Sequence, residues 1–516
     1  MLDSLAVVSP PCYYHSTLAK YTQMSQAPDI IALVSWNERQ SSVVLGVWRG
    51  VGDHGEAGKS GVRGRLFESE DGLAVRLMTN KLAPAMVGQK IILMVIPPPS
   101  LPGTSSEVRN QFLAPLHQVY AQATTRRNCP AESDWDWLTK GVDRVLANVR
   151  SGRDFLQTFQ PFWARELQVG PYFETLASAR RLGMVAECSA LLRRQVDARR
   201  PSPLDAFAAL APFDLYAGDG HYLEHATHDA AVAETYWATG HFFALNLKSQ
   251  SLFPLALADQ VGRKKEHDVR ALKRQSVATL RQGAGKGRKV LWVWDKAGVD
   301  LAFWQARKAS GIYFLSLCKT GMCLAVEREQ AVDFTQPINQ GVTSDCLVSD
   351  RRGLRLREIT FCDPRDGAVY VYLTSEMTLE PGLLALLYKT RWEIEKVYDE
   401  TKTKLQEKKS WATTATAKTM QAHFVAIVHN LLLLLQDWQQ QQGVENTAEI
   451  QRRQKRLDQQ QSDLAKTGQT LPLVYRILQR FTQATFKLIR WLRAHWHQAT
   501  SLPQALHQLR SLYAKL

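Results

Sequence analysis

Three acidic residues follow or lie on predicted structural elements in a pattern that suits metal chemistry. Asp219 ends a predicted strand at 213–220, Asp295 ends another at 289–295, and Glu395 lies on a charged helix. Clustered carboxylates repel one another unless cations lie among them. Mg²⁺ binds to a few carboxylates together with water and phosphate oxygens. Two such ions about 3.5–4 Å apart can activate a water or a 3′-hydroxyl and stabilise the leaving oxygen of a phosphodiester.

The charged helix places four side chains on one face. Spacings of three, four and seven residues bring side chains together along a helix, and these spacings separate Tyr388, Arg391, Glu395 and Lys402. One carboxylate is thus held between cations. The alternative interpretation is a solvated helix with ordinary ion pairs.

Other acids near the two strands are second choices as ligands. Asp214, Asp229 and Asp300 lie close in sequence, but none of them ends an apolar run as Asp219 and Asp295 do.

The elements around these acids predict a mixed sheet covered by helices. Apolar runs favour strands, and a β-rich insertion is expected at about 320–375, before the charged helix, which should begin near Pro381. Strand and helix order of this kind is typical of an α/β fold. The strands are predicted at 213–220, 241–247, 252–257, 289–295 and 312–318, with helical segments at 267–282 and 299–309.

The remaining chain divides into three regions. Residues 1–103 have no sustained period and are unassigned, and one hypothesis is an over-extended start with Met86 as a later initiation point. The pattern at 104–203 predicts a helical domain in which Ser133 is an N-cap. The sequence does not distinguish between a structural bundle and a DNA-binding domain. Residues 436–516 are expected to be a basic helical region, broken by polar, glutamine-rich stretches before an amphipathic segment from Leu471.

Charge and cysteine usage narrow the class of protein. The 516 residues carry a net charge of +15, and residues 401–516 hold 17 Lys and Arg against 6 Asp and Glu. A polyanionic partner follows, with nucleic acid ahead of a membrane surface. The seven cysteines are scattered and indicate a reducing cytoplasm. The apolar stretch 423–435 is too short for a bilayer span and predicts a buried core helix.

Three further motifs have plainer explanations. His221, His225 and His228 could form a zinc site, but histidines near a polyanion groove need no metal. The segment GAGKGRK at 283–289 precedes a strand instead of following one, so a flexible basic turn is expected, not a phosphate loop. A cluster of cations could follow a DNA backbone or merely solvate a helix: Arg263, Lys264, Lys265, Arg270, Lys273 and Arg274.

The spacing Tyr388-x2-Arg391-x3-Glu395-x6-Lys402, with RWEIE at its centre, resembles the Y-R-E-K signature of the IS-four-like insertion-sequence transposases. These belong to the DDE class and have an RNase H-like catalytic core. The resemblance covers roughly residues 212–435. It departs after Asp219, where the family often has a small hydroxyl residue and this chain reads GDGHYLEHATHD.

The resemblance implies site roles. Asp219, Asp295 and Glu395 would form the metal-binding catalytic triad for two Mg²⁺ ions, with Mn²⁺ as a substitute. Tyr388, Arg391 and Lys402 would contact the phosphates of the element ends, since Arg offers a two-pronged donor and Lys a mobile charge. Trp392 is expected in the core, with stacking on an unstacked base as the alternative.

The resemblance also implies a function: Mg²⁺-dependent cleavage at element ends, and transfer of the 3′-hydroxyl into target DNA by a cut-and-paste route. The expected partners are the repeats at the element ends, target DNA, and a second copy of the chain in a synaptic complex. The expected location is the cytoplasm of a bacterium, and the nucleoid when DNA is bound; no membrane is expected as a partner. Two alternatives are an RNase H-like structure-specific nuclease and a catalytically silent DNA-binding relic. Two regions are candidates for recognising the end sequence. They are the segment 105–200 and the basic tail, where Trp491 and Trp496 add apolar surface; the cations of the tail are Arg476, Arg480, Lys487, Arg490 and Arg493.

Overall fold

The computed structural model divides the chain into two compact units, residues 1–101 and 102–516. It describes six short strands between residues 31 and 95, and residues 106–127, 133–149, 151–163, 166–224, 228, 239–258, 268–482 and 485–515.

The first unit contains strands where the sequence allowed no assignment. A four-stranded sheet has the order β3-β2-β1-β6, and β4 pairs with β5. The predicted later start at Met86 lies outside the described residues. The strands are β1 (Ile31–Asn37), β2 (Ser42–Trp48), β3 (Val62–Gly64), β4 (Phe67–Ser69), β5 (Gly72–Ala74) and β6 (Ile92–Val95).

A nine-stranded mixed sheet forms the centre of the second unit, in the order β12-β13-β14-β15-β11-β10-β7-β8-β9. β10 pairs in parallel with both β7 and β11, and the other neighbours are antiparallel. The predicted α/β class with a mixed sheet is confirmed. The strands are β7 (Phe213–Leu223), β8 (Thr239–Asn246), β9 (Leu252–Ala258), β10 (Lys289–Val293), β11 (Ile312–Leu317), β12 (Leu324–Glu329), β13 (Val342–Asp350), β14 (Arg355–Cys362) and β15 (Val369–Thr374).

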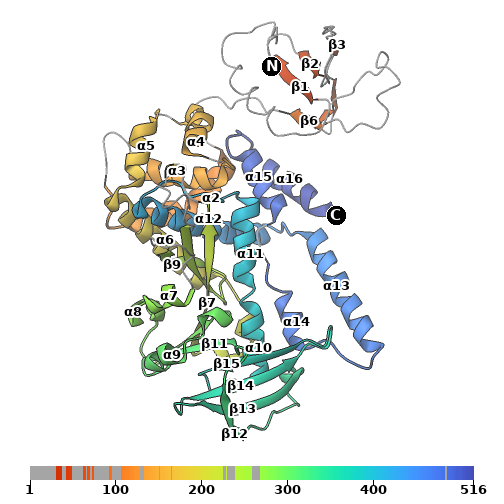
Figure 1. Ribbon diagram of the computed structural model, residues 1–516. Helices are drawn as coiled ribbons and strands as arrows, with labels where there is room; N and C mark the ends of the chain where they lie inside the picture. The colour runs from red at the N-terminus through yellow and green to blue at the C-terminus, as the bar shows by residue number, and fades with distance from the viewer. Residues whose placement is uncertain are drawn as a thin grey trace, which may run out of the picture. The chain divides into compact units, whose positions relative to one another are not determined.

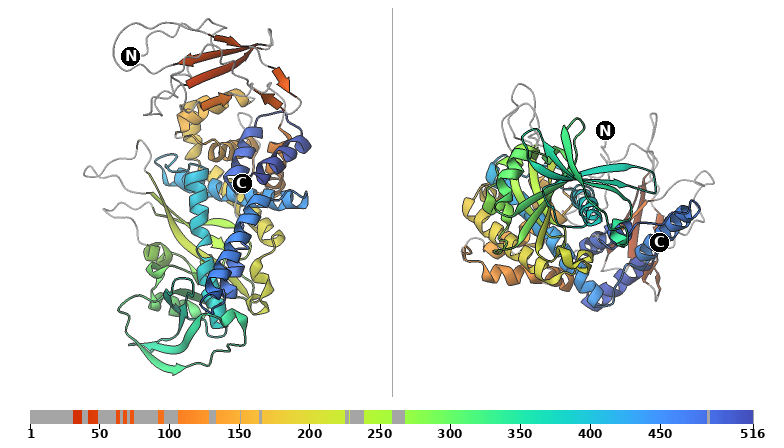
Figure 2. Two further views of the ribbon diagram at one scale, coloured as in Figure 1. Left: turned by 90° about the vertical axis from the view of Figure 1, so that its right-hand side faces the viewer. Right: turned by 90° about the horizontal axis from the view of Figure 1, so that it is seen from below.

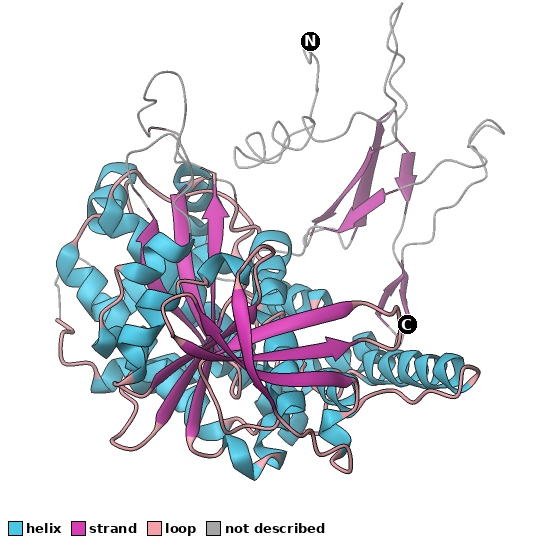
Figure 3. Ribbon diagram, turned by 60° about the horizontal axis from the view of Figure 1, so that its bottom comes forward, coloured by secondary structure: helices cyan, strands magenta, loops and turns pink. Residues whose placement is uncertain are grey.

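Helices cover both faces of this sheet (Figures 1 and 3). Alternate residues of a strand point to opposite faces. Leu291 and Val293 of β10 enter one core with α10 and α11, whereas Trp292 enters the opposite core with α8 and α9. A strand buried on both faces reads as a continuous apolar run, which explains KVLWV. The helices on the Trp292 side are α7 (Asp268–Lys273), α8 (Val277–Arg281) and α9 (Leu301–Lys308); on the Leu291 side lie α10 (Pro381–Thr390), α11 (Glu393–Asp399) and α14 (Leu473–Leu478).

The β-rich insertion predicted at about 320–375 is present as β12–β15. These strands extend the central sheet instead of forming a sheet of their own, because β15 pairs with β11. They form the near end of this unit in the view from below (Figure 2, right). α10 follows directly and begins at Pro381, as the sequence predicted.

The helices before and after the sheet share one hydrophobic core around α12 (Ala415–Gln441). Phe112, Leu138, Leu192, Phe424 and Leu492 all belong to this core. The sequence treated 104–203 and 436–516 as separate regions, but periodicity cannot show that they pack together. The predicted N-cap is confirmed, since the Ser133 hydroxyl accepts a bond from the Asp136 amide at 3.0 Å. The helices are α2 (Glu107–Gln122), α3 (Asp134–Leu146), α4 (Gly152–Phe159), α5 (Val169–Leu176), α6 (Ala179–Arg199), α15 (Phe486–His495) and α16 (Leu502–Ala514).

α12 meets the length and hydropathy of a membrane span, and 83% of its apolar window is buried inside the protein. It packs against α3, α6 and β9. The prediction of a buried core helix is therefore confirmed.

One helix was missed. The polar stretch that the sequence treated as a break forms α13 (Thr447–Ala465). Asn446 caps it by accepting a bond from the Glu449 amide at 3.3 Å, and Glu449 pairs with Arg452 and Arg453 one turn on. Only Ala448 and Leu464 of this helix are buried. A helix with so narrow an apolar stripe gives a weak periodic signal.

Candidate active site

Asp219 and Asp295 lie at the same level along the neighbouring parallel strands β7 and β10, Asp219 within β7 and Asp295 two residues past the end of β10. The last parallel pair joins Ala217 of β7 to Val293 of β10, and each aspartate comes two residues later. Ala217 and Val293 both face the core shared with α10 and α11. Because strand side chains repeat every two residues, Asp219 is directed to that same face, and the charge of Asp295 acts on Tyr388, which belongs to the same core.

The prediction that Asp219 ends its strand is wrong. β7 continues to Leu223, and Asp219 pairs with Phe243 of the antiparallel β8. The apolar run stops at Asp219 because the parallel partner β10 stops there, while the ladder with β8 continues. Asp295 lies two residues after the end of β10. Its Oδ1 accepts a bond from the Ala297 amide at 2.7 Å, which caps a short turn.

A close contact between strands explains the glycine before Asp219. A Cβ atom on Gly218 would lie 2.4 Å from the ring of Trp294. Trp294 immediately precedes Asp295 and is 1% exposed. The absence of a side chain at Gly218 therefore lets the two aspartate-bearing segments approach each other.

The prediction of one continuous helix from Tyr388 to Lys402 is wrong. α10 ends at Thr390, α11 starts at Glu393, and residues 400–404 form a π-helix. Tight bonds from the amide of residue i to the carbonyl of i−3 join the first two pieces, as between Ile394 and Arg391 at 3.1 Å. Single-turn π segments occur inside helices, often at functional sites, and are not visible in hydrophobic periodicity.

Despite this break, the contacts expected from the helical spacing are kept among Tyr388, Arg391 and Glu395. The Arg391 Nη2 lies 3.0 Å from Glu395 Oε1, and its guanidinium lies 5.5 Å from the ring centre of Tyr388. Arg391 is 6% exposed and Tyr388 8% exposed. A buried cation therefore holds the third acid beside the tyrosine.

Electrostatics connects this group to the two strand aspartates. Burial raises the pKa of Tyr388, Arg391 acts to lower it, and the charges of Asp295 and Glu395 raise it further. Burial acts to lower the pKa of Arg391, but Tyr388 and Glu395 raise it above its ordinary value. The charge of Asp219 adds to that increase. All three predicted acids therefore act on Tyr388 or Arg391.

A hydrogen bond fixes α11 against β7. The Tyr398 hydroxyl donates to the backbone carbonyl of Asp219 at 2.7 Å. Tyr398 lies one turn after Glu395, so this bond ties the third acid's helix to the first acid's strand. The ring of Tyr398 also lies 4.8 Å from that of His221. Sequence patterns missed Tyr398, because a tyrosine at a core spacing carries no chemical signal of its own.

The three acids have the ligand chemistry that a divalent metal requires, and Asp219 and Asp295 lie at the same level along the sheet. Mg²⁺ prefers oxygen ligands, and the three acids supply carboxylates. Within the described ranges, no three His, Cys, Asp or Glu side chains are grouped closely enough to hold an ion. Glu395 contacts Arg391 instead, so a metal would compete with Arg391 for this carboxylate.

Residues 203–431 match the family model of the transposase DDE domain. The match supports a DDE transposase of an insertion element, and such a domain implies DNA as a partner. No curated protein is similar enough to the chain to count as a match. The transposase DDE match contains all three acids and the charged segment from Tyr388 to Lys402.

Within the transposase DDE match, Lys402 and Trp392 differ from their expected surroundings. Lys402 lies in the π-helix. Burial of His221 lowers the pKa of that histidine, and the nearby charge of Lys402 lowers it further. Trp392 is 57% exposed, so the expectation that it packs in the core is wrong. It lies at the break between α10 and α11.

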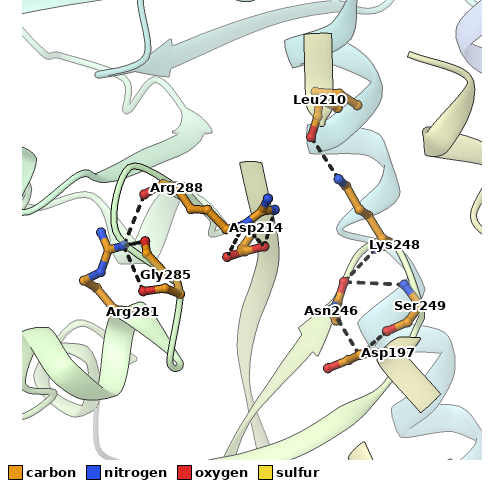
Figure 4. A network of polar contacts seen from close by, with 10 residues as sticks. Asp197, Leu210, Asp214, Asn246, Lys248, Ser249, Arg281, Gly285 and Arg288 are labelled. Carbon is orange, nitrogen blue, oxygen red and sulfur yellow. Dashed lines mark hydrogen bonds and ion pairs between the residues drawn. The ribbon is translucent and has the colours of Figure 1, made fainter. Parts of the chain in front are cut away.

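The alternative motifs take structural roles or lie outside the described residues. His221 is buried, whereas His225 and Asp229 lie outside the described residues, as do Arg263, Lys264 and Lys265. Asp300 caps α9 and pairs with Lys273, and Asp214 pairs with Arg288 at 2.6 Å (Figure 4). Of the other two basic residues, Arg274 binds the Leu257 carbonyl and Arg270 lies on α7.

The GAGKGRK segment is a turn that enters β10. Gly283 and Gly287 have φ angles of +76° and +83°, which glycine adopts without a Cβ clash. Arg281 donates to the carbonyls of Gly285 and Arg288 at 2.9 and 3.2 Å (Figure 4). These bonds hold the two carbonyls of the turn against Arg281.

The basic tail contributes to the core more than the sequence suggested. Trp491 and Trp496 are 2% and 3% exposed, not on the surface. Arg493 Nε donates to the Leu146 carbonyl at 2.6 Å, and burial lowers its pKa to about 10. Arg476, Arg480 and Arg490 are exposed, whereas Lys487 is half-buried and its Nζ donates to the Lys515 carbonyl.

We expect Tyr398→Phe to reduce strand cleavage about fivefold with little change in end binding. The variant removes one hydrogen bond, typically worth about 1 kcal/mol, and leaves the ring in place. Single-turnover cleavage and end binding measured side by side would check this. A similar loss in both would show that Tyr398 supports the fold and not the position of Asp219.

Proposed function

We propose that the chain is a cut-and-paste DNA transposase of the IS-four-like type. The observation that carries the proposal is the register of Asp219 and Asp295, two residues past the last parallel pair, together with the ion pair of Arg391 and Glu395. This arrangement lies inside the transposase DDE match.

Asp219, Asp295 and Glu395 would hold two Mg²⁺ ions, with Mn²⁺ as a substitute. When bound, such ions activate the attacking oxygen and stabilise the leaving one. In the first reaction, water attacks phosphorus at the element end and the bond to the 3′ oxygen breaks, which leaves a 3′-hydroxyl. In the second, this hydroxyl attacks a target phosphodiester, forms the new bond and releases the target's own 3′-hydroxyl.

The chain's own residues position the DNA. Arg391, held in a fixed orientation by Glu395 and Tyr388, offers a planar donor for a phosphate next to the scissile bond. Lys402 supplies a second charge, and Trp392 offers an exposed ring for a base. Two ends must be brought together, so the proposal includes a homodimer in a synaptic complex.

The test is an excision assay on a plasmid that carries the gene's native flanking DNA. We expect cleavage at the flanks with Mg²⁺, none after removal of the metal with EDTA, and recovery with Mn²⁺. Joined products would distinguish a transposase from a structure-specific nuclease, which would cleave without joining. Salt-sensitive binding without cleavage under every metal condition would overturn the proposal in favour of a DNA-binding relic.

A further inference from the structure

A basic groove adjoins the candidate active site on the side of α13. Its volume is about 750 Å³. Tyr388 and Arg391 of the candidate site form part of its wall, so it is continuous with that site. In Figure 1, α14 lies between α10 and α13, and these helices with α11 contribute most of the wall. Six cations line the groove: Arg365, Lys389, Arg391, Lys396, Arg453 and Arg456.

Most of these cations already have carboxylate partners. Lys396 pairs with Glu393, and Arg453 lies 3.1 Å from Glu449. Arg365 lies 2.8 Å from Asp363. These pairs fix the walls of the groove. Arg453 also donates to the Phe481 carbonyl at 3.1 Å, which joins α13 to the segment that follows α14.

Lys389 and Arg456 differ from the others. Among the described residues neither forms an ion pair, and they come from opposite walls, α10 and α13. Lys389 lies 3.8 Å from the ring centre of Tyr370 and 5.1 Å from that of Tyr475. Burial lowers its pKa to about 8, so the position is unfavourable for a cation without an anionic ligand.

Rings accompany the charges. Tyr370, Trp392 and Tyr475 also line the groove, and Trp392 is 57% exposed. Sites for unpaired nucleic acid combine a cationic track for phosphates with aromatic side chains for bases. A double helix presents its bases inside, so its backbone alone would not use the rings.

We propose that this groove binds an unpaired strand of DNA that continues from the scissile phosphate, with Lys389 and Arg456 as its phosphate ligands. The inference rests on the proposed function for its substrate. It adds α13, a helix outside the transposase DDE match at 203–431, to the DNA-binding surface.

The test measures binding of a short fluorescent oligothymidylate to the full chain in EDTA, so that cleavage plays no part. We expect Arg456→Gln to weaken binding about fivefold, and the slope of log affinity against log salt to fall by about 0.7, the value for one phosphate contact on a single strand. Arg456→Glu should weaken binding further. Arg456 is exposed and makes no bond among the described residues, so the melting temperature should not change.

Lys455→Gln is the matched control. Lys455 is the neighbouring cation on α13, is exposed, and does not line the groove. We expect less than a twofold effect and an unchanged salt slope. Equal losses in the Lys455 and Arg456 variants would overturn the inference, as would equal losses on a blunt duplex and the single strand. Because the binding assay needs no metal, its result does not depend on cleavage in the excision assay. Failure of this inference and failure of the proposed function can therefore be distinguished.

Discussion

Glu395→Gln should abolish strand cleavage while end binding remains. The change keeps the shape of the side chain and removes the negative charge that lies 3.0 Å from Arg391. Phosphoryl transfer depends on positioning and electrostatic stabilisation, and loss of one such group costs roughly 10²–10³-fold or more in rate. End binding should persist or strengthen, since one charge that repels phosphate is gone. Excision and gel-shift assays on the same preparation would measure both.

Asp399→Asn is the control for this variant. Asp399 lies one turn after Glu395 on α11, its side chain is 57% exposed, and its partner Lys404 is 4.0 Å away. It loses the same charge on the same helix, away from Arg391. We expect cleavage within about twofold of the unaltered protein. Cleavage near normal in Glu395→Gln would remove Glu395 from the catalytic role.

The fold around the candidate site could be predicted because its strands are buried. β10 and β11 are parallel neighbours with apolar residues on both faces, so they appear as uninterrupted runs. Asp295 and Asp219 stand out as the first polar positions after such runs. The exact end of β7 could not be predicted, because its ladder with β8 outlasts the apolar run.

The site was only partly visible in the sequence. Arg391 and Glu395 share a face by spacing alone, and the structure keeps them in contact. The break after Thr390 and the π-helix at 400–404 leave no periodic signature in the sequence. Arg456 was hidden for a different reason: α13 is polar nearly all round, and its place across the groove from α10 depends on contacts far away in sequence.

Gly382→Ala should destabilise the protein, although helix propensity predicts the opposite. Alanine inside a helix is favoured over glycine by about 1 kcal/mol. At Gly382, however, a Cβ atom would lie 1.9 Å from the backbone carbonyl oxygen of Ile338 and 2.9 Å from the Cα of Asn339. The Gly382 amide also donates to Asn339 Oδ1 at 3.0 Å. Because backbone cannot rotate away, we expect α10 to shift, at a cost of about 1–3 kcal/mol or more.

The measurement is the melting temperature of the variant beside that of Gly183→Ala. Gly183 lies in α6, and no atom beyond its own turn lies within 4 Å of a Cβ placed there. There we expect a gain, because only the helix propensity acts. Since α10 begins one residue before Gly382 and carries Tyr388, Gly382→Ala should also slow cleavage. An increase in melting temperature for both variants would show that the contact between α10 and the 337–339 turn yields easily, and that the turn does not fix the position of α10.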